Sequence, residues 1–251
     1  MKKNSKPLLY QFALSHYCEK ARWALDYKGV DYKIKNLIPG PHMLQTKRLA
    51  ANSSVPILVE EGKVVQDSTE IITYLDQKYP QKPLTPHSEE LRKEALELEE
   101  YFDEEVGIHL RRLFYFYVLE NRNLAISLLL QSGPGYGRPL YFFLFPVLKS
   151  LMKKAMRIHA ESARRSEERL RAALKNLDQR IGKEKFLVGG QFTRADLAAA
   201  SLLAPLCSPP QHDFIWPPVE SMPDELVRFR KEMEGAPFFK WVLKTYEEFR
   251  P

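Results

Sequence analysis

The sequence predicts a small α/β domain in residues 1–80, a linker in residues 81–88 and an all-helical domain in residues 89–251. Three observations support this organisation. Short apolar runs that are typical of strands alternate with helical patterns in the first part of the chain. The stretch "PQKPLTPHS" is rich in proline and breaks those patterns. After it, the apolar residues follow helical spacing almost throughout.

Changes in the period of the apolar residues predict the elements of the α/β domain. "LLYQFAL" is a short apolar run that is typical of a strand. From Cys18 the spacing becomes helical, and Gly29 is a typical residue after a helix C-terminus. "VDYKIKNLI" alternates in polarity and predicts a second strand. The next stretch, "PGPHMLQTKRLAANSS", is rich in Pro, Gly, Asn and Ser, so we expect a loop there.

A hairpin and a second helix complete this domain. "PILVE" and "KVVQ" flank Glu61 and Gly62, which together indicate a tight hairpin turn. Asp67 is followed by Glu70 three residues later, a spacing that resembles a capping box and predicts the start of a helix. The expected order is therefore strand, helix, strand, loop, strand, strand, helix.

The second domain shows helical patterns only. "SEELRKEALELEEYFDEEVGIHLRRLFYFYVLE" predicts a long helix, and residues 150–181 predict another single helix. "FTRADLAAASLLAPL" begins with Thr193 and Asp196, which have the spacing of a helix-start box, and its nearly all-apolar composition indicates a buried helix. "PFFKWVLKTYEEF" predicts the last helix.

The composition argues against several classes of partner. The formal net charge is +6, but basic and acidic residues are interleaved, so we expect no nucleic-acid partner. Cys18 and Cys207 are too few and too far apart for a disulfide framework or a zinc motif, so we expect a reduced, cytoplasmic protein without a metal. The first apolar run, interrupted by Gln11, is too short for a signal peptide. The most apolar run, "LYFFLFPVL", is far shorter than the roughly 18 residues of a membrane span.

This order of domains resembles the cytosolic glutathione transferase superfamily, in a bacterial theta-like or unassigned class. Specific motifs carry the resemblance along nearly the whole chain: Val55-Pro56 opens the third strand, Asp67-Ser68 opens the following helix, "LIPGPHM" is similar to an "LxxGxH" stretch, and "FTRADLAAASLL" is similar to the buried capping box of the family. The resemblance implies a thioredoxin-like N-terminal domain that binds glutathione and a helical domain that supplies the site for an electrophile.

The resemblance also implies how glutathione is held. The backbone of Val55, exposed by a cis Pro56, would pair with the cysteinyl part of glutathione like an added strand. Ser68 and the free amides at the helix start suit the α-carboxylate of the γ-glutamyl end, and Asp67 suits its ammonium group. His42 would lie near the glycine carboxylate. Plain N-capping remains the alternative for Asp67, and solvation is the alternative for His42.

Ser15 is the expected catalytic residue. Lowering a thiol pKa from about 8.5 by two units requires about 2.7 kcal/mol. One hydrogen bond to a thiolate supplies about 1.5–3 kcal/mol. A single hydroxyl at the first strand–helix junction is therefore sufficient, and Ser15 matches the catalytic serine of theta-like members. Glu19 and Lys20 depart from that pattern. N-capping is the alternative for Ser15, and Tyr17 and Tyr10 are alternative thiol partners.

Cys18 raises a rival chemistry, a glutathione-dependent thiol oxidoreductase or peroxidase. In the related redox proteins the first cysteine of a C-x-x-C pattern attacks, and here that position is occupied by Ser15. Cys18 also falls on the apolar stripe of the predicted helix, so we expect it to be buried and inert. A third alternative is a non-catalytic glutathione-binding module.

The resemblance implies a homodimeric detoxification enzyme that conjugates glutathione, as co-substrate and without another cofactor, to small apolar electrophiles. Tyr115 and Tyr117, from the aromatic cluster "FYFY", are candidates for the electrophile site. Residues 131–154 break the helical pattern with glycines and prolines before a bulky apolar run. We favour core or lid packing for them over a dimer contact, and a membrane contact through residues 140–154 is the least favoured interpretation.

Overall fold

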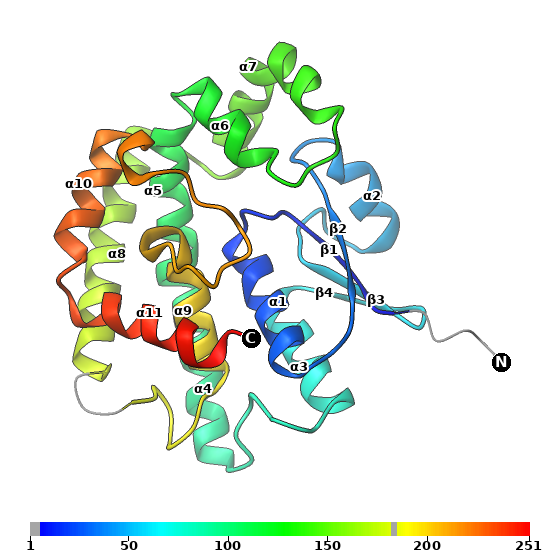
Figure 1. Ribbon diagram of the computed structural model, residues 1–251, viewed down its shortest axis with the longest axis vertical. Coiled ribbons are helices and arrows are strands. Elements are labelled where there is room, and N and C mark those ends of the chain that lie inside the picture. The colour runs from blue at the N-terminus through cyan, green and yellow to red at the C-terminus, as the bar shows by residue number, and fades with distance from the viewer. Residues whose placement is uncertain (1–5, 182–184) are drawn as a thin grey trace.

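Figure 1 shows a computed structural model of the chain that describes residues 6–181 and 185–251. A four-stranded sheet lies in the N-terminal part, with the strands in the order β2-β1-β3-β4. β1 is parallel to β2 and antiparallel to β3, and β3 and β4 form an antiparallel hairpin. The elements of this part are β1 (Leu8–Gln11), α1 (His16–Tyr27), β2 (Lys33–Asn36), α2 (His42–Leu49), β3 (Ile57–Glu60), β4 (Lys63–Gln66) and α3 (Ser68–Lys78).

The arrangement confirms the thioredoxin-like fold predicted for this region. α1 and α3 lie on the side of the sheet that faces the remaining helices, whereas α2 lies on the outer side (Figure 1). Leu9 of β1 pairs with Ile34 on one side and Leu58 on the other, and the side chains of Leu9 and Leu58 are fully buried. Glu61 and Gly62 both have positive φ, as a tight turn between antiparallel strands requires.

One expectation for this region is wrong. α2 lies within residues 39–54, where we expected only a loop. Pro39, Gly40 and Pro41 precede the helix and do not interrupt it, because proline is tolerated in the first turn of a helix. Thr46 is fully buried, so this face of α2 packs against the interior, and its hydroxyl donates within the helix to the carbonyl of His42 at 3.1 Å.

The rest of the described chain is helical. Figure 1 shows these helices beside the sheet domain, with α9 close to α1. They are α4 (Glu89–Phe102), a π-helical turn (Asp103–Gly107), α5 (Ile108–Val118), α6 (Arg122–Leu129), α7 (Gly137–Ala155), α8 (Ala160–Ile181), α9 (Arg194–Cys207), a short 3₁₀ turn (Val219–Ser221), α10 (Asp224–Met233) and α11 (Pro237–Phe249). Among the described residues, no helix is long and apolar enough to cross a membrane.

Residues 150–181 form two helices, so the prediction of one continuous helix is wrong. Arg157 has a positive φ, and the amide of Ile158 donates back to the carbonyl of Lys153 at 2.8 Å, which closes α7. The hydroxyl of Ser162 then accepts from the amide of His159 at 3.0 Å at the start of α8. The spacing of the apolar residues would place Leu151 on the buried face of such a helix, but Leu151 is 58% exposed.

The predicted buried helix is confirmed as α9. Thr193 and Asp196 form the expected capping box, in which the amide of Thr193 donates to the Asp196 carboxylate at 2.9 Å. Nearly every residue of α9 is buried, and α9 packs against α1, α4 and α11. The largest core cluster therefore extends from the sheet through α1 into the helical domain.

Buried ion pairs join α1 to the helical domain. The Lys20 ammonium lies 2.7 Å from Glu99 and 2.6 Å from Asp103, and both Lys20 and Glu99 are almost completely buried. Glu99 also pairs with Arg194 at the start of α9. Glu19 pairs with Arg250, at 2.9 Å, near the other end of the chain. These contacts give a structural role to the two residues that depart from the family pattern.

Candidate active site

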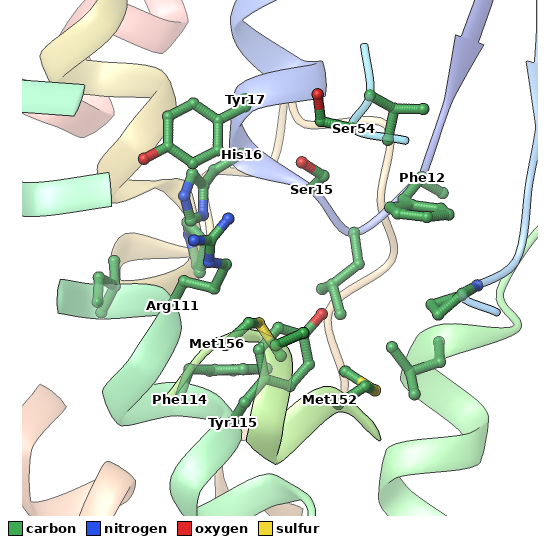
Figure 2. Close-up of a pocket in the computed structure, with 18 residues that line it drawn as sticks. Phe12, Ser15, His16, Tyr17, Ser54, Arg111, Phe114, Tyr115, Met152 and Met156 are labelled. Carbon is green, nitrogen blue, oxygen red and sulfur yellow. The ribbon is translucent and has the colours of Figure 1, made fainter. Parts of the chain in front are cut away.

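A cavity of about 260 Å³ lies between the N-terminal end of α1 and the helices α5 and α7 (Figure 2). The sheet domain contributes its residues from one side and the helical domain from the other. The lining residues are Phe12, Ala13, Leu14, Ser15, His16, Tyr17, Pro39, Ser54 and Val55 from the first part, and Leu110, Arg111, Phe114, Tyr115, Leu129, Met152, Ala155, Met156 and Pro205 from the second.

Ser15 lies in the wall of this cavity and is also the N-cap of α1. Its hydroxyl oxygen accepts a hydrogen bond from the amide of Cys18 at 3.3 Å. That bond uses an oxygen lone pair and leaves the hydroxyl proton free to be donated. N-capping and donation to a thiolate are therefore compatible in one side chain. The free amides of the first turn of α1 add a favourable field for a negative charge.

His16 and Tyr17 follow Ser15 and line the same cavity. Burial and, to a smaller extent, the nearby Arg111 lower the pKa of His16 to about 3, so the imidazole is neutral. Its Nε2 atom is buried and has no hydrogen-bond partner within the described residues. The Tyr17 hydroxyl donates to the carbonyl of Asp103 at 2.7 Å, and burial raises its pKa well above the ordinary value. The Tyr17 proton is therefore engaged elsewhere.

The other two candidates for thiol chemistry are placed differently. Cys18 is fully buried, and burial raises the pKa of its thiol against a smaller opposing effect of the Ser15 hydroxyl. This environment disfavours the thiolate that nucleophilic chemistry requires. Tyr10 lies in β1, is not among the lining residues, and has the Lys35 ammonium 5.1 Å from its ring centroid.

Val55 reaches the cavity at the start of β3. The peptide bond between Val55 and Pro56 is cis, as the resemblance predicts. The amide of Asp67 donates to the carbonyl of Pro56 at 3.2 Å, so the start of α3 lies directly beside the segment that lines the cavity. Asp67 is exposed and caps α3 by accepting from the amide of Thr69 at 2.8 Å, while Ser68 is buried.

His42 is the first residue of α2 and does not line the cavity. Its ring packs edge-on against Phe12, a lining residue, at 4.8 Å between centroids. Burial lowers the pKa of His42, and its Nδ1 atom has no partner among the described residues. Val55, Asp67, Ser68 and His42 thus lie around or next to the Ser15 side of the cavity.

The two tyrosines proposed for the electrophile site separate. Tyr115 faces the cavity, and burial raises its pKa to about 12 with Arg111 opposing (Figure 2). Tyr117 instead lines a different, polar pocket with Glu167 and Arg171. Residues two positions apart on a helix point to different faces, so only one of the two can reach this cavity.

Comparisons with known proteins place the chain in a family. The family models "Glutathione S-transferase, N-terminal domain" and "Glutathione S-transferase, C-terminal domain" match residues 9–83 and 141–237. A "Probable maleylacetoacetate isomerase" of Caenorhabditis elegans is 30% identical over 203 residues, which cover 80% of this chain and 78% of that protein. The chain therefore belongs to the cytosolic glutathione transferase superfamily.

Other relatives match a smaller region. "Glutathione S-transferase 1" of Dianthus caryophyllus is 40% identical over 94 residues, which cover 36% of this chain and 42% of that protein. Among solved structures, a glutathione S-transferase of Ceriporiopsis subvermispora in complex with glutathione has a TM-score of 0.65, 14% identity and 98% coverage of both chains. One from Methylobacterium radiotolerans has a TM-score of 0.58, 21% identity and 95% coverage of both. These structural likenesses support the fold alone.

The sequence reasoning missed several lining residues. Arg111 lies four residues before Tyr115, which was a candidate, and this spacing places two side chains on one face of a helix, so Tyr115 could have pointed to Arg111. His16 follows Ser15 directly at the helix start. Met152 and Met156 have the same spacing near the end of α7 and beyond it, but an apolar pair of that kind is far more often part of a core.

Proposed function

We propose that the protein is a glutathione transferase that joins the glutathione sulfur to an electrophile in the cavity beside Ser15. The observation that carries the proposal is the position of Ser15, which combines a free hydroxyl proton, the N-terminus of α1 and a mostly apolar cavity. Family membership and the cis Val55–Pro56 peptide beside the same cavity support it.

The proposed chemistry needs no group beyond glutathione and the electrophile. The Ser15 hydroxyl donates to the glutathione sulfur and stabilises the thiolate, whose proton leaves to solvent. The thiolate then forms a carbon–sulfur bond with the electrophile. When the electrophile is an aryl halide, the carbon–halogen bond breaks and halide departs. Asp67 and Ser68 would hold the γ-glutamyl end, Val55 the cysteinyl backbone, and His42 the region of the glycine carboxylate.

The two parts of the chain would bind different substrates. Residues 1–80 would bind glutathione, residues 89–251 would supply the wall that receives the electrophile, and residues 81–88 would connect them. Five further properties stay predictions: the theta-like class, assembly as a homodimer, a cytoplasmic location, a role in detoxification and the membrane contact of residues 140–154. The burial of Cys18 speaks against the thiol oxidoreductase alternative.

Ser15→Ala tests the proposal. Losing a hydrogen bond to a charged sulfur costs about 1.5–3 kcal/mol, so we expect kcat/KM with chlorodinitrobenzene to fall about 10- to 100-fold. Calorimetric titration should show glutathione affinity within about threefold of the wild type, because the bonds to the glutathione backbone and termini remain. The ultraviolet absorbance of the bound thiolate should titrate at a higher pH in the variant.

Ser15→Thr is the matched control, since threonine keeps both the hydroxyl and the capping oxygen. It should retain a substantial part of the activity. Equal turnover by the wild type and Ser15→Ala would remove Ser15 from this role, and failure of the wild type to bind glutathione would reject the proposed function as a whole.

A further inference from the structure

Among the described residues that line the cavity, Arg111 has the only charged side chain. It lies on α5, one turn before Tyr115, and Figure 2 shows its guanidinium group on the side of the cavity where Ser15 lies. The rest of the wall is formed mainly by aliphatic, aromatic and methionine side chains. Arg111 is half-buried, so its guanidinium group keeps contact with water, and an anionic ligand in the cavity would supply the partner that a charge beside apolar side chains favours.

Within the described residues, Arg111 takes part in none of the ion pairs. Its guanidinium carbon lies 5.7 Å from the centroid of the Tyr17 ring. The adjacent Arg112 is bound differently: it donates to the carbonyl of Met156 at 3.2 Å and to the Ser166 hydroxyl at 3.0 Å. Arg169, on α8, pairs with Glu105. Arg111 thus differs from Arg112 and Arg169 in having no acceptor among the described residues.

The surroundings of Arg111 suit an anion. In the part of the chain that the structure describes, no aspartate or glutamate lines the cavity, and His16 is neutral, so no carboxylate of the wall competes with a bound anion or repels it. Tyr115 lies one helical turn further along the same face, and no hydrogen bond of the described residues uses its hydroxyl group. Arginine binds carboxylates through two parallel N–H donors, and a tyrosine hydroxyl adds a third donor.

We infer that the electrophile carries a carboxylate on an apolar body, and that Arg111 binds this carboxylate with Tyr115 as a second donor. The inference rests on the proposed function and names the substrate class of the same cavity. The carboxylate takes no part in the reaction: the carbon–sulfur bond forms elsewhere on the molecule. Arg111 is therefore a specificity-determining residue. By binding the anion at one end of the electrophile, it places the reactive carbon of the same molecule near Ser15.

Glutathione itself has two carboxylates and is the rival source of the anion. Its γ-glutamyl end is expected at Ser68 and its glycine end near His42, and neither residue lines the cavity that holds Arg111. Titration with glutathione separates the two sources. An Arg111→Gln variant should bind glutathione with the wild-type affinity if the arginine serves the electrophile.

A matched pair of ligands tests the inference without requiring turnover. The saturated analogue of ethacrynic acid and its methyl ester share one apolar body, differ in the carboxylate, and do not react with thiols. By calorimetry in the presence of glutathione, we expect the wild type to bind the acid about 10- to 100-fold more tightly than the ester. Arg111→Gln should reduce this preference to about threefold or less, and Arg111→Lys should keep part of it.

Arg138→Gln is the charge-matched control, since Arg138 is exposed and does not line the cavity. It should keep the full preference for the acid. Turnover of reactive ethacrynic acid and its ester, compared as a ratio of kcat/KM, should follow the same order across the variants. Tyr115→Phe should lower the ratio by a smaller factor than Arg111→Gln.

Three results would overturn the inference: no preference for the acid in the wild type, a preference that survives Arg111→Gln, or a loss of glutathione affinity in that variant as large as the loss of acid affinity. If neutral chlorodinitrobenzene is conjugated in a Ser15-dependent manner while the acid is not preferred, the proposed function stands and the inference fails. If the acid binds through Arg111 but no electrophile is turned over, the anion site stands and the transferase proposal fails.

Discussion

Replacing Lys20 with methionine should destabilise the protein strongly. The Lys20 side chain is fully buried, and its ammonium group contacts Glu99 at 2.7 Å and Asp103 at 2.6 Å. Methionine fills most of the space of the aliphatic stem, so the lost charge dominates the effect. Glu99 keeps Arg194 as a partner, but Asp103 loses its cation. Removing one member of a buried pair costs about 3–5 kcal/mol, which is the loss of unfolding free energy we expect.

Urea denaturation followed by circular dichroism measures this loss. Lys93→Met is the matched control, because the Lys93–Glu97 pair is 3.8 Å long and both side chains are largely exposed. The control should change the free energy of unfolding by less than about 0.5 kcal/mol. A loss below about 1 kcal/mol in Lys20→Met would refute the assignment of a buried ion pair to this position.

The pH dependence of the Lys20→Met defect provides a second check. Burial raises the pKa of Asp103 to about 6 in the wild type, and Lys20 opposes that rise. Without Lys20 the pKa of Asp103 rises further. A carboxyl group with a raised folded-state pKa binds its proton more tightly when folded, so stability falls as pH rises through that pKa. The defect should therefore be smaller at about pH 5 than at about pH 8, and a defect independent of pH would contradict this explanation.

Two further predictions concern α1. Burial alone would raise the pKa of Glu19, but Arg22, His212 and Arg250 lower this pKa to about 2. The stability that the ionised Glu19 contributes should therefore be complete above the ordinary glutamate pKa of about 4.5, and it should be lost as the pH falls towards 2. Urea denaturation across that range should show the advantage of the wild type over Glu19→Gln shrinking, and a constant advantage would argue against it. Because Cys18 and Cys207 are both buried, a thiol-specific reagent should label the native protein far more slowly than the urea-unfolded protein. Rapid labelling of Cys18 in the native protein, located by mass spectrometry, would reopen the redox alternative.

The sequence predicted the sheet domain well because its signals are local. Strand periodicity and the Glu61–Gly62 turn each depend on residues a few positions apart, and both are present in the structure. In the helical domain, the Thr193–Asp196 box is a signal of the same kind, and it is present at the start of α9. α2 was missed for an equally local reason. Proline and glycine at positions 39–41 resemble a loop, and the same residues are compatible with a helix that begins just after them.

The ion pairs and the wall of the cavity depend on distant residues. Glu19 and Lys20 looked like departures from a motif, because their partners Arg250 and Glu99 lie far away in the chain and no local spacing reveals them. A charged residue on a predicted helix is usually on its solvated face, so Arg111 carried no signal by itself. Its position in the cavity follows from how α5 packs against α8, which only the tertiary structure determines.

The π-helical turn between α4 and α5 accommodates an extra residue without rotating α5 about its axis. A π turn holds one residue more than the equivalent α-helical turn, and each residue of a helix advances the side chains by about 100°. The wider turn absorbs that residue, so the side chains of α5 keep the orientation they would have in a regular helix with one residue fewer. Deleting one residue from Asp103–Gly107 should therefore restore a regular helix and leave Arg111 and Tyr115 facing the cavity. A deletion in the regular part of α5 before Arg111 has no such turn to absorb it, and it would rotate both side chains by about 100°.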